Sequence, residues 1–134
     1  MNKVRDLDGN LVNWNLNGCS PTDAAKSSFH LAARKLLKEI YPTMQILEEV
    51  PVHLRKNSIV YLDFYIPLIR QCVEVHGEQH YKFVAHFHGN MMGFTKAKKL
   101  DADKKYWCEI NNINFVELPY NKQESWGNLI YGNG

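Results

Sequence analysis

The sequence predicts an α/β fold built on a mixed four-stranded sheet, with a small hairpin added at its N-terminus. Three observations support this prediction: β-branched and aromatic residues fill the stretch 61–80, an amphipathic helical segment precedes it, and a second helical segment leads into a short strand at 113–118. The order is helix, three strands, helix, strand. A hairpin followed by a helical crossover implies both antiparallel and parallel pairing in one sheet.

Length and composition restrict the class of protein. The chain has 134 residues, enough for one domain, and its net charge of +2 is too small to indicate a polyanionic partner by itself. Three cysteines without a C-x-x-C spacing argue against a disulfide framework or a structural zinc site, so we expect a reducing, cytoplasmic environment. No signal peptide and no apolar run of about 18 residues is visible, so we expect neither secretion nor a membrane span.

Residues 1–20 are expected to form the hairpin extension and residues 21–134 the main domain. Segments 4–7 and 11–14 flank Asp8-Gly9, a dipeptide suited to a tight turn with positive φ. We rank structural cover of the sheet above a substrate or partner contact for this hairpin.

The first helix is expected to begin at Ser20, which can cap it, with Pro21 in the first helical position, and to end before Pro42. Apolar residues recur at helical spacing from Phe29 to Ile40. The expected elements after this helix are a strand over 44–52, a basic turn over 53–58, the hairpin, a loop over 81–93, a helix over 95–111 and a last helical turn or two over 123–131.

The hairpin within 61–80 concentrates polar groups on one surface. Its two strands are joined by a turn at 67–70, and alternate residues of a strand share a face. Asp63 should therefore lie close to Glu74, with His76 and His80 beside them. The alternation expected is Tyr61, Asp63 and Tyr65 opposite Leu62, Phe64 and Ile66, and Cys72, Glu74 and His76 opposite Val73 and Val75.

Two neighbouring acids on strands suited to burial indicate a cation. Like charges repel, and burial adds to the cost unless a divalent ion or a shared proton compensates them. Carboxylate oxygens with an imidazole nearby suit Mg²⁺ or Mn²⁺. The alternative is that these acids lie on the solvated face of a half-exposed hairpin.

The element order resembles the core of the PD-(D/E)XK nuclease superfamily over about residues 21–119. Asp63 in L-D-F-Y-I-P and Glu74 in V-E-V-H match its two acids, whereas His76 stands where the common pattern has lysine. The order Asp63, His76-Gly77, His80 is similar to the very-short-patch-repair-type (EDxHD) endonucleases and their homing relatives.

This resemblance implies a restriction-endonuclease-like fold and an Mg²⁺- or Mn²⁺-dependent DNA endonuclease. Asp63 would contact the metal, and Glu74 would be a second ligand or hold metal-bound water. His76 would be the general base or orient the attacking water, because an imidazole can accept a proton at neutral pH. His80 would lie beside the scissile phosphate or the leaving group.

Such enzymes also use a glutamate from the first helix. Here His30 aligns with that position, so the role is either changed or filled from elsewhere, with Glu48 as one option. Asp101 and Lys104 lie where related domains often carry an acid and a base on the second helix.

Basic residues are expected to contact the DNA backbone and to make binding salt-dependent. The alternative for the lysine-rich helix is an ordinary solvated surface. The residues assigned to this contact are Arg55, Lys82, Lys96, Lys98, Lys99 and Lys104.

Two other classes of function stay open. One is a catalytically inactive nuclease-fold module that binds DNA or a protein, favoured by the missing lysine and the missing helix glutamate. The other is a zinc protein that uses His76, His80, His86 and His88. A chain of this length has little room for a specificity domain, so we expect nicking, a structured substrate or a homodimer rather than long-site recognition by a monomer.

Overall fold

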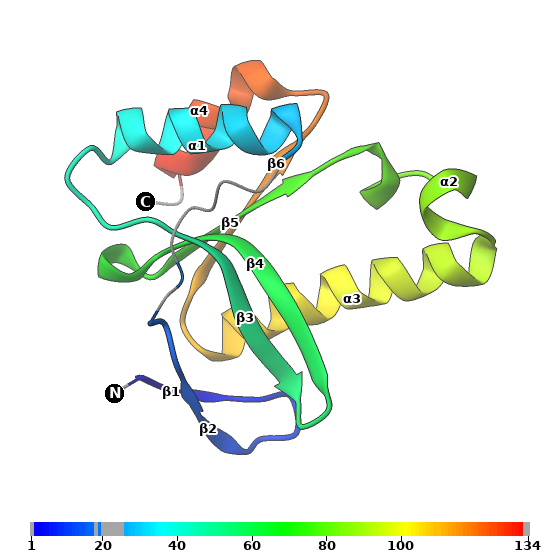
Figure 1. The fold of residues 1–134 in the computed structure, drawn as a ribbon, viewed down its shortest axis with the longest axis horizontal. Coiled ribbons are helices and arrows are strands. Elements are labelled where there is room, and N and C mark those ends of the chain that lie inside the picture. Colours follow the sequence, from blue (N-terminus) through cyan, green and yellow to red (C-terminus); the bar gives the residue numbers. More distant parts are fainter. Residues whose placement is uncertain (1, 18, 20–25, 133–134) are drawn as a thin grey trace.

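Residues 2–17, 19 and 26–132 are described by the computed structural model, and they form a two-stranded sheet, a four-stranded sheet and four α-helices (Figure 1). The elements are β1 (Asn2–Arg5), β2 (Leu11–Trp14), α1 (Ser28–Ile40), β3 (Leu47–Arg55), β4 (Ser58–Ile66), η1 (Pro67–Ile69), β5 (Gln71–His76), η2 (Glu78–His80), α2 (Ala85–His88), α3 (Met91–Ile110), β6 (Asn114–Pro119), η3 (Gln123–Ser125) and α4 (Trp126–Gly132).

The larger sheet has the order β3-β4-β5-β6 and is mixed, as predicted. β3, β4 and β5 pair antiparallel, whereas β5 and β6 pair parallel and are connected through α3. In Figure 1, α1 and α4 lie on one side of this sheet and α3 lies on the other. The end of β5 therefore emerges between two helical layers.

Each face of the sheet has its own apolar core. On the α1 side, Leu37 and Trp126 pack against Phe64, Val73 and their neighbours. On the other side, the long ends of β3 and β4 pack against the last turns of α3 and against the β1-β2 hairpin. Burial of these side chains is the main stabilising contribution that the fold can offer.

The predicted alternation along β4 is wrong in part. Leu62 packs in the same core as Tyr65, whereas Phe64 belongs to the opposite core. The side-chain faces change at Asp63, and on β3 they change at Glu49, whose φ of 51° is left-handed. A non-glycine residue in that conformation interrupts the regular pleat, so both strands reverse their faces at the same level of the sheet.

Several element boundaries differ from the predicted ones. The described part of α1 begins at Ser28, and Ser27 caps it by accepting the His30 N–H at 3.1 Å; the predicted cap, Ser20, lies outside the described residues. α3 begins four residues earlier than predicted because Asn90 caps it and accepts the Gly93 N–H at 2.9 Å. The expected loop before α3 contains the short helix α2.

The N-terminal hairpin forms as predicted, with Gly9 at a φ of +86° in its turn. Val4 and Trp14 are buried in the core beneath β3 and β4, and the Trp14 ring meets Trp107 edge-on at 5.1 Å. The Trp14 indole N–H also donates to the Pro51 carbonyl at 2.9 Å. These contacts are those of a structural cover.

All three cysteines are free thiols, with Cys72 and Cys108 buried. Among the helices of the described residues, none is both long and apolar enough to cross a membrane.

Candidate metal centre

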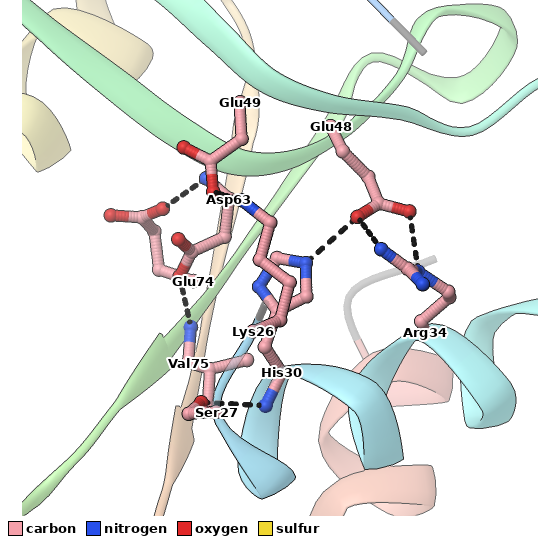
Figure 2. A network of polar contacts seen from close by, with 9 residues as sticks. All are labelled: Lys26, Ser27, His30, Arg34, Glu48, Glu49, Asp63, Glu74 and Val75. Atoms are coloured by element: carbon pink, nitrogen blue, oxygen red, sulfur yellow. Dashed lines mark hydrogen bonds and ion pairs between the residues drawn. The ribbon is translucent and has the colours of Figure 1, made fainter. Parts of the chain in front are cut away.

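The backbone pairing of β4 with β5 ends at Asp63, and beyond this point side-chain carboxylates accept hydrogen bonds from the backbone N–H groups of the opposite strand. The last backbone pair is Phe64 with Val73. Beyond it, the Asp63 N–H donates to Glu74 Oε2 at 2.6 Å, and the Val75 N–H donates to Asp63 Oδ2 at 2.8 Å (Figure 2). Asp63 and Glu74 are therefore neighbours, as the sequence predicted, and each is fixed by the opposite strand.

Asp63 is the acid of this region whose charge is left uncompensated. Glu74 is buried and pairs with Lys104 Nζ at 2.7 Å. Within the described residues no ion pair involves Asp63. Burial, followed by the charge of Glu74, raises the pKa of Asp63 to about 7. A nearby cation would favour the ionised carboxylate and remove this penalty.

Two further potential ligands reach Asp63 from α1 and β3. One donor atom from each of His30, Glu49 and Asp63 lies within 4.8 Å of the other two. The left-handed backbone of Glu49 turns its carboxylate toward Asp63, as Figure 2 shows. Lys26 Nζ lies 2.6 Å from Glu49 Oε1. We call His30, Glu49 and Asp63 the ligand group.

Glu48 holds His30 in place rather than joining the ligand group. Its carboxylate receives two hydrogen bonds from Arg34, both of 2.9 Å, and contacts His30 Nε2 at 2.8 Å. Burial alone would raise the pKa of Glu48, but the hydrogen bonds from Arg34 and His30 lower it. An ionised Glu48 accepts the Nε2 proton and leaves the Nδ1 lone pair of His30 for a metal, an arrangement typical of metal-bound histidines.

His76 and His80 form a second group, on the α3 side of β5, and among the described residues they do not join Asp63 in one group of potential ligands, contrary to the prediction. His80 Nδ1 lies 2.8 Å from Asp101 Oδ2, and His76 Nδ1 lies 3.4 Å from Glu117 Oε1. The two rings stack with centroids 4.0 Å apart and planes 8° from parallel. Hydrogen bonds from His76 and then Tyr81 lower the pKa of Glu117 to about 2.

The imidazoles of this second group do not form a metal site as they stand. Donor atoms of His76, His80 and Asp101 also lie within 4.8 Å of one another. A metal must lie near the plane of each imidazole that binds it, however, and no point close to both rings satisfies two parallel planes. His76 Nε2 is buried and has no hydrogen-bond partner among the described residues. In the neutral tautomer that donates from Nδ1 to Glu117, Nε2 carries a lone pair.

The histidines of α2 do not complete a zinc site. His88 Nδ1 accepts the Val84 N–H at 3.0 Å, and its ring contacts Phe83 and Phe94. His86 lies against Phe87. Within the described residues, neither histidine belongs to a group of potential metal ligands.

The basic residues assigned to DNA differ in what their side chains contact. Lys104 points inward to Glu74, with a side chain only 15% exposed, so its position does not match the predicted backbone contact. Lys98 donates to the His80 carbonyl at 3.0 Å and lies over the Tyr81 ring. The remaining set is Arg55, Lys82, Lys96 and Lys99, whose side chains are at least partly exposed; Arg55, Lys82 and Lys99 make ion pairs of 3.6–3.9 Å with acids nearby.

Sequence reasoning missed Glu49, Lys26 and Glu117. The adjacent acids Glu48-Glu49 on a strand were a signal that at least one of them is specialised. The signal did not say which, because regular alternation would have sent the two carboxylates to opposite faces. The positive φ of Glu49 identifies it as the acid whose carboxylate lies near Asp63.

No protein-family model matches the chain, and no solved structure is significantly similar to it. The chain is similar to the uncharacterized protein 307L of Invertebrate iridescent virus 6, with 39% identity over 64 residues, 48% of this chain and 32% of the relative. It is also similar to the uncharacterized protein 094L of Frog virus 3, with 32% identity over 69 residues, 51% of this chain and 44% of the relative. The matches thus cover less than half the length of either relative.

Proposed function

We propose that this chain is a metal-dependent endonuclease that hydrolyses phosphodiester bonds in DNA. The observation that carries the proposal is Asp63, a partly buried carboxylate without an ion-pair partner among the described residues, next to Glu49, Glu74 and His30. The order α1-β3-β4-β5-α3-β6 and the mixed sheet support a restriction-endonuclease-like fold.

The donor set suits a divalent cation. Asp63 and Glu49 would supply oxygen, His30 would supply nitrogen, and Glu74 would bind directly or through water. Because one donor is an imidazole, we expect Mn²⁺ to support at least as much activity as Mg²⁺. When bound, such a cation stabilises negative charge on a phosphoryl group and makes a bound water more acidic.

The chain's own residues would supply the other parts of the reaction. Glu48 and Arg34 orient His30. His76, whose Nδ1 faces Glu117, lies on the other side of β5 from the ligand group, so its Nε2 would accept the proton of the attacking water only from a phosphate bound at the end of β5, between the two groups. His80, held by Asp101, can donate to or orient the leaving group. Lys98 and the exposed lysines of α3 would attract the DNA backbone.

Plasmid nicking tests the proposal. Wild-type protein with Mn²⁺ or Mg²⁺ should convert supercoiled DNA to the open circle, and EDTA should stop the reaction. Asp63→Asn, which keeps the side-chain shape, should lower the rate by about 100-fold or more. Glu39→Gln, which changes an exposed acid near the end of α1, is the control and should cut normally. Equal rates for the two variants would refute the proposal.

The second candidate is a catalytically inactive nuclease-fold module that binds DNA or a protein. It is favoured by the ion pairs of Lys104 with Glu74 and of Lys26 with Glu49, because these lysines neutralise acids that would otherwise attract a metal. Salt-sensitive DNA binding without cleavage in either metal would favour this candidate.

A further inference from the structure

A hollow of about 510 Å³ opens beside the ligand group, between the start of α1, the end of β5, η2 and α2. Its volume lies within the range of roughly 300–1,000 Å³ that is usual for small-molecule sites. Its lining includes Ser27, Phe29, Val75, Gln79, Phe87 and Tyr120.

The hollow and the ligand group share a border. Val75, which lines the hollow, donates its N–H to Asp63 Oδ2 at 2.8 Å. Ser27, on the α1 side of the hollow, accepts the His30 N–H at 3.1 Å. Figure 2 shows Ser27 and Val75 close together, below Asp63 and beside His30. A phosphate bound near Asp63 would therefore have the hollow as its immediate neighbour.

Three of the side chains that line the hollow are aromatic, those of Phe29, Phe87 and Tyr120. The Phe29 and Tyr120 rings meet at 6.2 Å and 68°, and both are partly buried. Phe87 also lines the hollow and is 61% exposed, so its ring is accessible to a ligand there. Aromatic faces bind nucleobases by stacking, whatever the base.

The polar groups of the hollow suit a base rather than a phosphate. The exposed carboxylate of Glu78 lines the hollow, and its charge would repel a second phosphate there. The Gln79 amide makes no hydrogen bond within the described residues, so its donor and its acceptor are both available to a base edge. Gly77 permits this position, because a Cβ there would lie 2.6 Å from Gln79 Oε1.

We propose that this hollow receives an unpaired nucleobase next to the phosphate that is cut, so that the preferred substrate is DNA with unpaired nucleotides. The inference rests on the proposed nuclease function. A paired base inside a duplex would first have to leave its stack, which costs free energy that single-stranded DNA does not have to spend.

Binding and cleavage, measured separately, test the inference. A fluorescein-labelled 20-nucleotide single strand and the same sequence as a duplex are titrated by anisotropy in Ca²⁺, which replaces Mg²⁺ to suppress cleavage. Wild type should bind the single strand more tightly. Phe87→Ala should weaken single-strand binding about 5- to 100-fold, and Gln79→Ala should weaken it less. Tyr131→Ala, which removes an aromatic ring that is 67% exposed on α4, is the control and should bind like wild type.

The outcomes separate the two proposals. If wild type nicks plasmid in Mn²⁺ but Phe87→Ala binds the single strand like wild type, the base site is wrong and the nuclease stands. If single-strand binding depends on Phe87 but no metal supports cleavage, the base site stands and the nuclease is wrong. Equal affinity for single strand and duplex, unchanged in both variants, also overturns the base site.

Discussion

Both sides of β5 carry carboxylates and imidazoles, but the two sides differ in whether each carboxylate has an ion-pair partner. On the α1 side, carboxylates gather around Asp63 until one of them lacks an ion-pair partner among the described residues, and its pKa rises to about 7. On the α3 side, Glu117 and Asp101 each face an imidazole, and the pKa of Glu117 falls to about 2. On the first side a bound cation would favour the ionised form of Asp63, whereas on the second side His76 Nε2 has no hydrogen-bond partner among the described residues. Under the proposed function, the first side would hold the metal and the second would move the proton.

The largest expected effect is a loss of stability when Lys104, the α3 lysine that pairs with Glu74, is replaced. Lys104→Met leaves Glu74 buried without its cation and should lower the free energy of unfolding by about 3–5 kcal/mol. Lys98→Met removes an exposed lysine of the same helix and should cost roughly 0.5 kcal/mol or less. Denaturant unfolding at pH 7 measures both, and equal losses would mean that the Lys104–Glu74 pair is not a buried pair in solution.

The next effect is a pH dependence on the α1 side. Because the pKa of Asp63 is raised from 3.8 to about 7, the folded protein keeps a proton that the unfolded chain has released between these values. Stability should therefore fall as pH rises through this window, by roughly 2–4 kcal/mol, and Asp63→Asn should abolish this loss. Unfolding in EDTA from pH 4 to pH 8 measures it. Parallel curves for variant and wild type would contradict the assignment.

Metal affinity should depend on the residue that orients His30. Glu48→Gln removes the charge that fixes the His30 ring and should weaken Mn²⁺ binding by about 10- to 100-fold. Glu39→Gln changes an exposed acid near the end of α1, the helix that carries His30, and should leave the Mn²⁺ affinity unchanged. Calorimetric titration with Mn²⁺ compares them, and the orienting role fails if both bind like wild type.

The smallest effect has the opposite sign and belongs to the α3 side. The lowered pKa of Glu117 contributes stability that is present above about pH 4.5 and is lost as pH falls toward about 2. Glu117→Gln should flatten the stability profile in that acidic window by less than about 1 kcal/mol, because the side chain is 40% exposed and solvent screens its charge. Glu109→Gln, an exposed acid on α3, is the control. If stability fell more steeply with decreasing pH in Glu117→Gln than in wild type, Glu117 would not be stabilising the folded protein in this window.

Local patterns in the sequence were enough to predict the mixed sheet, the turn between β4 and β5 and the meeting of Asp63 with Glu74. These features follow from alternation, turn residues and the order of elements. The position of Glu49 could not be predicted in this way, because it depends on one left-handed residue that reverses the faces of two strands. The stacking of His76 on His80 and the partnership of His76 with Glu117 depend on tertiary packing, which brings η2 and β6 beside the end of β5.

The inward direction of Lys104 is a further case. On a helix with several exposed lysines, the sequence offers no means of telling which one is buried. The deciding factor is the buried acid that faces the helix from β5, since Glu74 would be costly to bury without a cation.

A crystal structure of the protein grown or soaked with Mn²⁺, with anomalous scattering data to locate the ion, tests the central assignment most directly. We predict one strong anomalous peak bound by Asp63, Glu49 and His30. A peak beside His76, His80 and Asp101, or no peak at saturating Mn²⁺, would contradict the assignment.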